Sequence, residues 1–261
     1  MESQTGDQYA AFIHQKYLSQ GAQYVHKREN RFYWQERTKE RLTKYLQTHP
    51  IDVVLDLGCA SGVLARDLAR QFPEKEFIGV DFSHELIRAA QHFDAPANAR
   101  FFEEDIVAWS RRWRQDSSAY QDKKILCLVM GIMGHYGVTD TLTLAVADIW
   151  GQIKHGALMM TFHNDNLCGR SILRGRDKRY WTGEQAMNFF SGARDEGNVH
   201  YRSFVLSDAL ACLTSGWDRQ LLGADDWILK LPTFMLRKIT TRFELFIERP
   251  LFAGPRPPEA R

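Results

Sequence analysis

The residues best suited to bind a ligand surround a glycine-containing loop. An apolar run over residues 51–57 ends in the loop Gly58-Cys59-Ala60-Ser61-Gly62, and apolar residues then recur at helical spacing. The first N–H groups of a helix lack partners inside it, and its dipole is positive there. This arrangement predicts a site for an anionic or polar ligand at the loop.

Two carboxylates flank the loop. Asp56 lies just before it, and Asp81 ends the next apolar run, 19 residues after Gly62. An acid in that place can accept hydrogen bonds from both hydroxyls of a ribose. The spacing Gly58-x-x-x-Gly62 differs from the G-x-G-x-x-G dinucleotide fingerprint, and no Gly-Lys-Ser/Thr follows as it would in a P-loop.

Three segments together resemble the motifs of the class I S-adenosylmethionine-dependent methyltransferases. Residues 54–62 look like the first motif, 78–83 like the second and 104–106 like the third, in the family's order and spacing. The resemblance covers roughly residues 51–162 and implies a methyltransferase with S-adenosylmethionine as its cofactor. The family often has glycine where this chain has Ala60, a departure that should not abolish binding.

The resemblance also implies a role for each matching residue. The loop would lie along the methionine and ribose, Asp56 would face the methionine ammonium, and Asp81 would bind the ribose hydroxyls. Adenine would lie between Phe82 and Ile106, with Asp105 at its amino group. The predicted cofactor-binding residues are Asp56, Gly58, Cys59, Ala60, Gly62, Asp81, Phe82, Ser83, Asp105, Ile106 and Met130.

More ordinary roles remain open for some of these residues. Asp56 and Asp81 could simply cap helices, and Asp105 could be an acid of a turn. Cys59 could be a reactive thiol, although a small loop residue fits better. Ser83 is also a good N-cap for the helix that follows it.

The residues that would carry out methyl transfer should follow the fourth and fifth strands, because ligands of open α/β sheets bind beyond the carboxyl ends of the strands. Methyl transfer mainly requires alignment of the reactants, and a general base only where the acceptor arrives protonated. We predict that His135 is that base or a substrate ligand; a packing or capping histidine is the alternative. The predicted substrate contacts are Tyr136, His163, Asn164, Arg170 and Arg174, the arginines gripping a carboxylate or phosphate unless they belong to a solvated basic loop.

Apolar runs alternate with helical patterns along the middle of the chain. Strands are predicted at 51–57, 76–80, 99–103, 124–130 and 157–162, and helices at roughly 64–72, 85–93 and 142–153. This alternation predicts an α/β fold with a Rossmann-like, mostly parallel sheet and helices on both faces. A helix at 204–215 and strands at 217–222 and 242–248 would complete it, with the last strand antiparallel.

The chain divides into three predicted parts. Residues 1–50 form an N-terminal helical cap, with helices at roughly 7–18 and 30–48. Residues 51–249 form the methyltransferase domain, with lid insertions at about 163–202 and 224–241, and residues 250–261 are a Pro-rich tail. The apolar side chains of the cap could cover the pocket, form a homodimer interface, or both.

Composition and charge limit the kinds of partner that we expect this chain to bind. With 34 basic and 32 acidic residues, 44% apolar residues and a net charge of +2, the chain reads as a globular protein without a nucleic-acid-binding surface. Its 4 cysteines form no CxxC pair and have no histidine partner at finger spacing, so we expect no metal and no disulfide. No signal peptide and no apolar run of about 18 residues is present, which predicts a cytoplasmic protein without membrane contact.

These observations favour a small-molecule acceptor. Oxygen methylation is slightly favoured because His135 offers a base, while nitrogen and carbon acceptors stay open. A macromolecular acceptor is one alternative, and a non-catalytic S-adenosylmethionine-binding module is another, because a fold alone does not establish catalysis.

Overall fold

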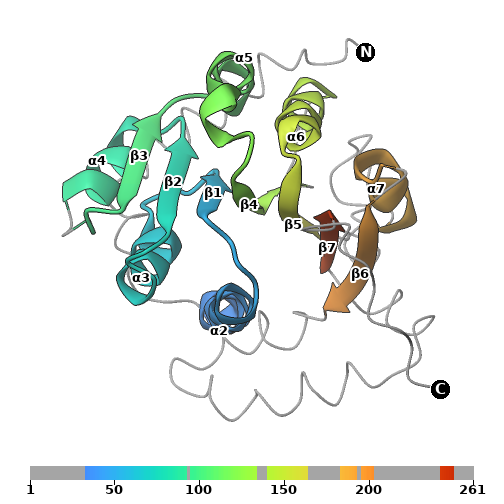
Figure 1. Ribbon diagram of the computed structural model, residues 1–261, viewed down its shortest axis with the longest axis horizontal. Coiled ribbons are helices and arrows are strands. Elements are labelled where there is room, and N and C mark those ends of the chain that lie inside the picture. Colours follow the sequence, from blue (N-terminus) through green and yellow to red (C-terminus); the bar gives the residue numbers. More distant parts are fainter. Residues whose placement is uncertain are drawn as a thin grey trace, which may run out of the picture.

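The computed structural model describes residues 33–92, 95–133, 140–163, 183–192, 195–202 and 242–249. They contain a seven-stranded sheet in the order β3-β2-β1-β4-β5-β7-β6 (Figure 1). β1 to β5 pair in parallel, and β7 runs antiparallel to both β5 and β6. The predicted mostly parallel sheet with an antiparallel last strand is confirmed.

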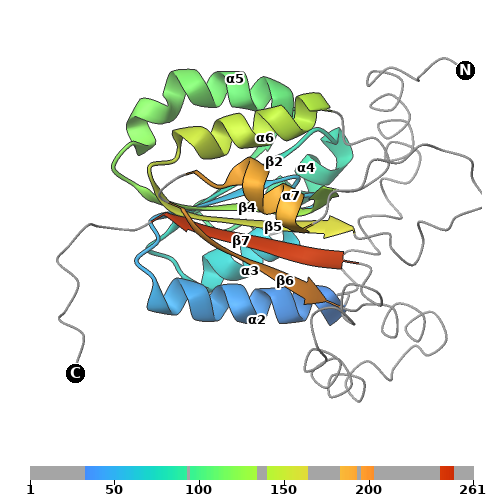
Figure 2. The ribbon, with the colours of Figure 1, turned by 90° about the vertical axis from the view of Figure 1, so that its right-hand side faces the viewer.

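The strands of the sheet are β1 (Val53–Leu57), β2 (Glu76–Asp81), β3 (Ala99–Glu103), β4 (Lys124–Met133), β5 (His155–His163), β6 (Glu196–Arg202) and β7 (Arg242–Arg249). The helices are α2 (Tyr33–Thr48), α3 (Val63–Gln71), α4 (His84–His92), α5 (Ile106–Asp116), α6 (Asp140–Gln152) and α7 (Gly183–Phe190), with a short 3-10 helix at Ser117–Tyr120. Figure 2 shows α5, α6 and α7 above the sheet and α2 and α3 below it. Among the described residues, no helix is both long and apolar enough to cross a membrane.

Successive side chains of the central strand β1 point to opposite faces of the sheet and contribute to the two main hydrophobic cores. Val53, Leu55 and Leu57 of β1 pack into the core beneath α5, α6 and α7, whereas Val54 packs into the core that includes α2 and α3 side chains. Side chains of a strand point alternately to opposite faces, so a continuous apolar run is the pattern of a strand covered on both faces. Asp56 lies on the same face as Val54 and is almost fully buried.

Helix α2 is joined to β7 by an ion pair and a hydrogen bond from a tyrosine. Arg41 donates from Nη1 and Nη2 to Glu244 Oε2 and Oε1 at 2.8 and 2.5 Å, and Glu244 is 1% exposed. Tyr45 Oη donates to Glu248 Oε1 at 2.8 Å, and burial followed by this carboxylate raises the pKa of Tyr45. The phenol therefore stays neutral, and the helix predicted at 30–48 is confirmed as α2, docked on the last strand.

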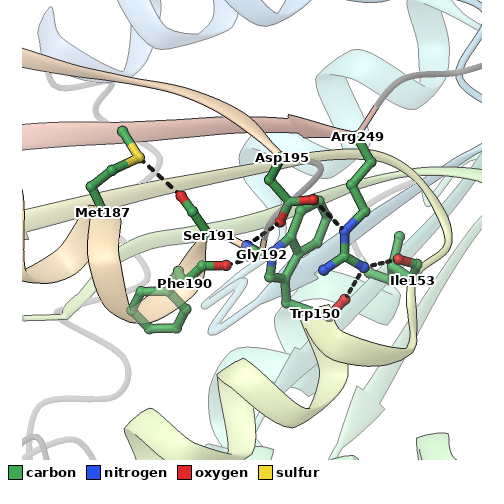
Figure 3. A network of polar contacts seen from close by, with 8 residues as sticks. All are labelled: Trp150, Ile153, Met187, Phe190, Ser191, Gly192, Asp195 and Arg249. Atoms are coloured by element: carbon green, nitrogen blue, oxygen red, sulfur yellow. Dashed lines mark hydrogen bonds and ion pairs between the residues drawn. The ribbon is translucent and has the colours of Figure 1, made fainter.

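The end of the sheet opposite the carboxyl ends of β1 to β5 is held by Arg249 (Figure 3). Its Nε donates to Asp195 Oδ1 at 3.1 Å, and its Nη1 donates to the carbonyls of Trp150, at 2.8 Å, and Ile153. The guanidinium also lies 4.0 Å from the centre of the Trp150 ring. A cation is favourable at the negative end of a helix, so Arg249 ties β7 to the end of α6.

One predicted segment differs from the structure. The sequence predicts a loop or lid over 163–202, but α7 and β6 lie within it. Helix α7 has only 8 residues, and β6 is an edge strand that pairs with β7 alone, so neither leaves a long periodic pattern. The elements predicted at 7–18, 204–215 and 217–222, the insertion at 224–241 and the tail at 250–261 lie outside the described residues.

Candidate cofactor site at the carboxyl edge of the sheet

The loop after β1 is built by backbone hydrogen bonds and left-handed residues. The N–H groups of Gly58 and Cys59 both donate to the Val80 carbonyl, at 2.7 and 3.1 Å, which ties the loop to β2. Gly58, Ala60 and Gly62 have φ angles of +76°, +52° and +67°. Glycine adopts such angles without strain, but alanine does not. The loop therefore depends on its two glycines and holds a strained residue between them.

Both glycines are also needed for space. A Cβ at Gly58 would lie 2.7 Å from Ile132 Cγ1, and a Cβ at Gly62 would lie 2.5 Å from Phe101 Cε1. Contacts this short force the neighbouring side chain to move. The loop is thus packed between the end of β4 and the helix-covered side of β3.

Asp81 organises the site. Its Oδ2 accepts a hydrogen bond from the Ala60 N–H at 2.9 Å, and its Oδ1 accepts one from the Ser83 N–H at 2.9 Å. The residue is 8% exposed, so its carboxylate is held in one orientation between the loop and the start of α4. A carboxylate has about four lone-pair positions, so one that holds two N–H groups can also accept from ribose hydroxyls.

Cys59 lies close enough to both Asp56 and Asp81 for their charges to act on its thiol. Burial raises the pKa of the Cys59 thiol well above its ordinary value, and the charges of Asp56 and Asp81 raise it further. Only the thiolate is a strong nucleophile. Burial and the raised pKa of Cys59 therefore disfavour the alternative of a reactive thiol.

Asp105 has a structural role that the sequence left open. Its Oδ1 accepts from the Val107 N–H at 2.7 Å, and its carbonyl accepts from the Trp109 N–H at 2.8 Å, so it caps α5. Its side chain is exposed, and capping fixes its direction at the edge of the site. Ile106 is buried in the core beneath α5, which leaves little of its surface for adenine.

Ser83 starts α4, but not through its side chain. Its carbonyl accepts from the Ile87 N–H at 3.0 Å, as expected of an N-cap residue. Its hydroxyl is buried and has no hydrogen-bond partner within the described part of the chain. The predicted cap position is confirmed, while the expected side-chain cap is wrong, since the hydroxyl accepts no hydrogen bond from the described start of α4. The Ser83 N–H is held by Asp81.

Several predicted residues cannot be placed. His135, Tyr136, Asn164, Arg170 and Arg174 lie outside the described residues, and only the backbone of His163 is described, at the end of β5. Their catalytic and substrate-binding roles stay predictions. In the described ranges, no cluster of three or more His, Cys, Asp or Glu residues could hold a metal ion.

The structure adds two residues that the sequence prediction missed. Ile132 lies against Gly58, and Thr161 Oγ1 accepts from the Gly131 N–H at 2.6 Å. Met130, predicted to bind the cofactor, is half-buried in the same stretch of β4 and packs beside the α2 and α3 core. A glycine within an otherwise apolar strand often marks a bulge, so Gly131 was the available signal.

Comparisons with known proteins identify the kind of domain and fold. Residues 54–124 match the model of a methyltransferase domain. No curated protein matches the sequence. Among solved structures, the plantazolicin methyltransferase BamL, in complex with a triazolic desmethylPZN analog and SAH, is similar with a TM-score of 0.56 and 14% identity over 88% of this chain and 90% of that chain.

Two further structures are similar. The plantazolicin methyltransferase BpumL in complex with SAH has a TM-score of 0.53 and 15% identity over 87% of this chain and 88% of that chain. The methyltransferase domain of bacterial CtHen1-C has a TM-score of 0.54 and 13% identity over 84% and 99%. At such identities the likeness is one of fold. Together with the domain match, it confirms the resemblance drawn from the three motifs.

Proposed function

We propose that this chain, a class I S-adenosylmethionine-dependent methyltransferase in its domain and fold, methylates a small-molecule acceptor. Bound S-adenosylmethionine supplies the methyl group from its sulfonium. The residues of this chain bind and orient the cofactor and exclude water, and positioning of this kind can lower a barrier by roughly 7–11 kcal/mol.

The observation that carries the proposal is the Asp81 carboxylate. It lies at the carboxyl end of β2, oriented by the N–H groups of Ala60 and Ser83 beside the loop. A ligand with two adjacent hydroxyls suits such an acceptor, and the start of α3 adds a favourable environment for the methionine carboxylate. The donor set therefore fits S-adenosylmethionine, with Asp81 at the ribose.

The acceptor is inferred from weaker signals. His135 follows β4 in the sequence, where a base would take a proton from a hydroxyl acceptor, and this favours oxygen methylation. The net charge of +2 gives no support to a nucleic-acid acceptor. Transfer to a macromolecule, or binding without transfer, would each replace this part of the proposal.

The first test is transfer of labelled methyl. Purified protein receives S-adenosylmethionine labelled in the transferred methyl and a size-fractionated extract of the source cells. We expect label in the small-molecule fraction, absent with Asp81→Asn, because an amide has one acceptor oxygen for two backbone N–H groups and the ribose. Asp122→Asn, an exposed acid before β4, is the matched control and should transfer normally.

The outcomes separate the alternatives. Label on protein or RNA contradicts the small-molecule acceptor but keeps the cofactor site. No transfer, with cofactor binding intact by calorimetry, favours the non-catalytic module. His135→Gln that transfers at the wild-type rate would contradict the role of His135 as a base.

A further inference from the structure

The end of β4 departs from the regular sheet beside the cofactor loop. Val129 pairs with Met160 and Met133 pairs with Phe162, so residues 130–132 of β4 stand opposite Thr161 alone in β5. β-Bulges leave residues unpaired, bend the strand and recur next to active sites, where they redirect a side chain. This bulge lies at the carboxyl edge of the sheet, where ligands of such folds bind.

The hydroxyl of Thr161 is the hydrogen-bond acceptor for a backbone N–H that the bulge removes from the β-ladder. The Gly131 N–H donates to Thr161 Oγ1 at 2.6 Å. Gly131 has a φ of +74°, and no described atom would lie within 4 Å of a Cβ built on it. No described residue crowds this position, and it is the backbone conformation, secured by Thr161, that favours glycine.

The bulge directs Ile132 onto the cofactor loop. Ile132 lies against Gly58, the first residue of that loop, closely enough that a Cβ on Gly58 would overlap it. The backbone geometry of Gly131 thus sets where a side chain from β4 meets the loop after β1.

The strand order says which half of the cofactor this contact can affect. In the order β3-β2-β1-β4-β5, the bulge lies on the other side of β1 from β2 and β3. The ribose is proposed to bind Asp81, which ends β2, and the adenine amino group is predicted to meet Asp105, which follows β3, so the adenosine half would lie on that side. The β4 side is left for the methionine half and the incoming acceptor.

We infer that Thr161 is a positioning residue for methyl transfer: by holding the Gly131 N–H, it fixes the β4 bulge and Ile132 against the methionine half of the cofactor site. The inference rests on the proposed function, because it takes S-adenosylmethionine to lie along the loop. Thr161 acts through Gly131 and Ile132 and does not itself contact the reacting atoms.

The test compares three probes by calorimetry: S-adenosylmethionine, S-adenosylhomocysteine and adenosine. Thr161→Val keeps the β-branched shape but removes the acceptor, so the Gly131 N–H loses its partner, and we expect the first two probes to bind about tenfold more weakly. Adenosine should bind as it does to wild type. Thr161→Ser keeps the hydroxyl and is the matched control, expected to bind all three probes normally.

Each outcome decides the inference. Equal weakening of all three probes would indicate general damage, and unchanged binding of all three would show that the hydroxyl is dispensable; either overturns it. If Thr161→Val fails to fold, Gly131→Ala strains the same bulge, with no clash against the described atoms, and should give the same selective loss. Wild-type protein that binds none of the probes would refute the proposed function, and this inference with it.

Discussion

Replacing Ala60 by glycine should stabilise the protein, against the usual effect of that change. Ala60 has a φ of +52° between two left-handed glycines, and its N–H donates to Asp81 Oδ2 at 2.9 Å. Glycine keeps this hydrogen bond and removes the clash between Cβ and the backbone. The perturbation therefore isolates the strain of a single methyl group.

The size of the expected change in the free energy of unfolding follows from two opposing contributions. An L-residue in the left-handed region costs about 1–2 kcal/mol. Glycine loses more conformational freedom on folding than alanine does, which costs about 0.4–1 kcal/mol. The difference is a net gain of about 0.8 kcal/mol in the free energy of unfolding, or about 2 °C in Tm for a chain of this size.

Urea unfolding followed by circular dichroism measures this gain, with Ala108→Gly as the matched control. Ala108 is exposed in the first turn of α5, where the same change should cost up to about 1 kcal/mol. The two variants should therefore shift the urea midpoint in opposite directions. If Ala60→Gly lowers the midpoint as Ala108→Gly does, the left-handed strain assigned to Ala60 is refuted.

Three further predictions concern packing and protonation. The Asn98 amide donates from Nδ2 to three carbonyls around the end of α3, at 2.8 to 3.1 Å. An ionised aspartate cannot donate, so Asn98→Asp should lower the free energy of unfolding by about 2–3 kcal/mol. A urea midpoint equal to that of wild type would contradict this capping role of Asn98. Arg249→Met should lower the free energy of unfolding by about 3–5 kcal/mol, because the buried Asp195 carboxylate loses its cation. Adding Asp195→Asn should recover part of this loss. If the double variant is no more stable than Arg249→Met, the explanation by an uncompensated charge is wrong. Burial raises the pKa values of the Cys59 and Cys127 thiols. With the other two cysteines replaced by serine, we expect a thiol reagent at pH 8 to label the native protein far more slowly than the unfolded protein, and the labelling rate should rise only above the ordinary thiol pKa. Rapid labelling of the native protein with a midpoint near 9.0 would contradict the burial of both thiols.

Sequence pattern alone sufficed for the parts of the fold in which local signals and burial coincide. The runs that became β1, β2, β4 and β5 are apolar over most of their length, because both faces of these strands are covered. A related reason made it possible to predict which residues lie at the carboxyl edge of the sheet, namely Asp56, Gly58 and Asp81. Parallel strands bring their carboxyl ends to one edge, so residues that end successive strands meet there whatever the rest of the chain does.

The tertiary structure decided the contacts between residues far apart in the chain. The Arg41–Glu244 pair joins residues 203 positions apart, and no local pattern identifies which acid a helix arginine will meet. The same holds for Thr161 and Gly131, 30 positions apart, whose contact depends on the register of two strands and on a bulge between them.

Even some local features needed the folded structure. The left-handed conformation of Ala60 goes with the hydrogen bonds that tie the loop to Val80 and Asp81 rather than with the preference of alanine. The lack of a partner for the Ser83 hydroxyl within the described part of the chain could not be read from the sequence either. Residue type and spacing therefore determined which chemistry gathers at the carboxyl edge. The orientation of each group was decided by register and packing, because these depend on neighbours that the chain brings together only when it folds.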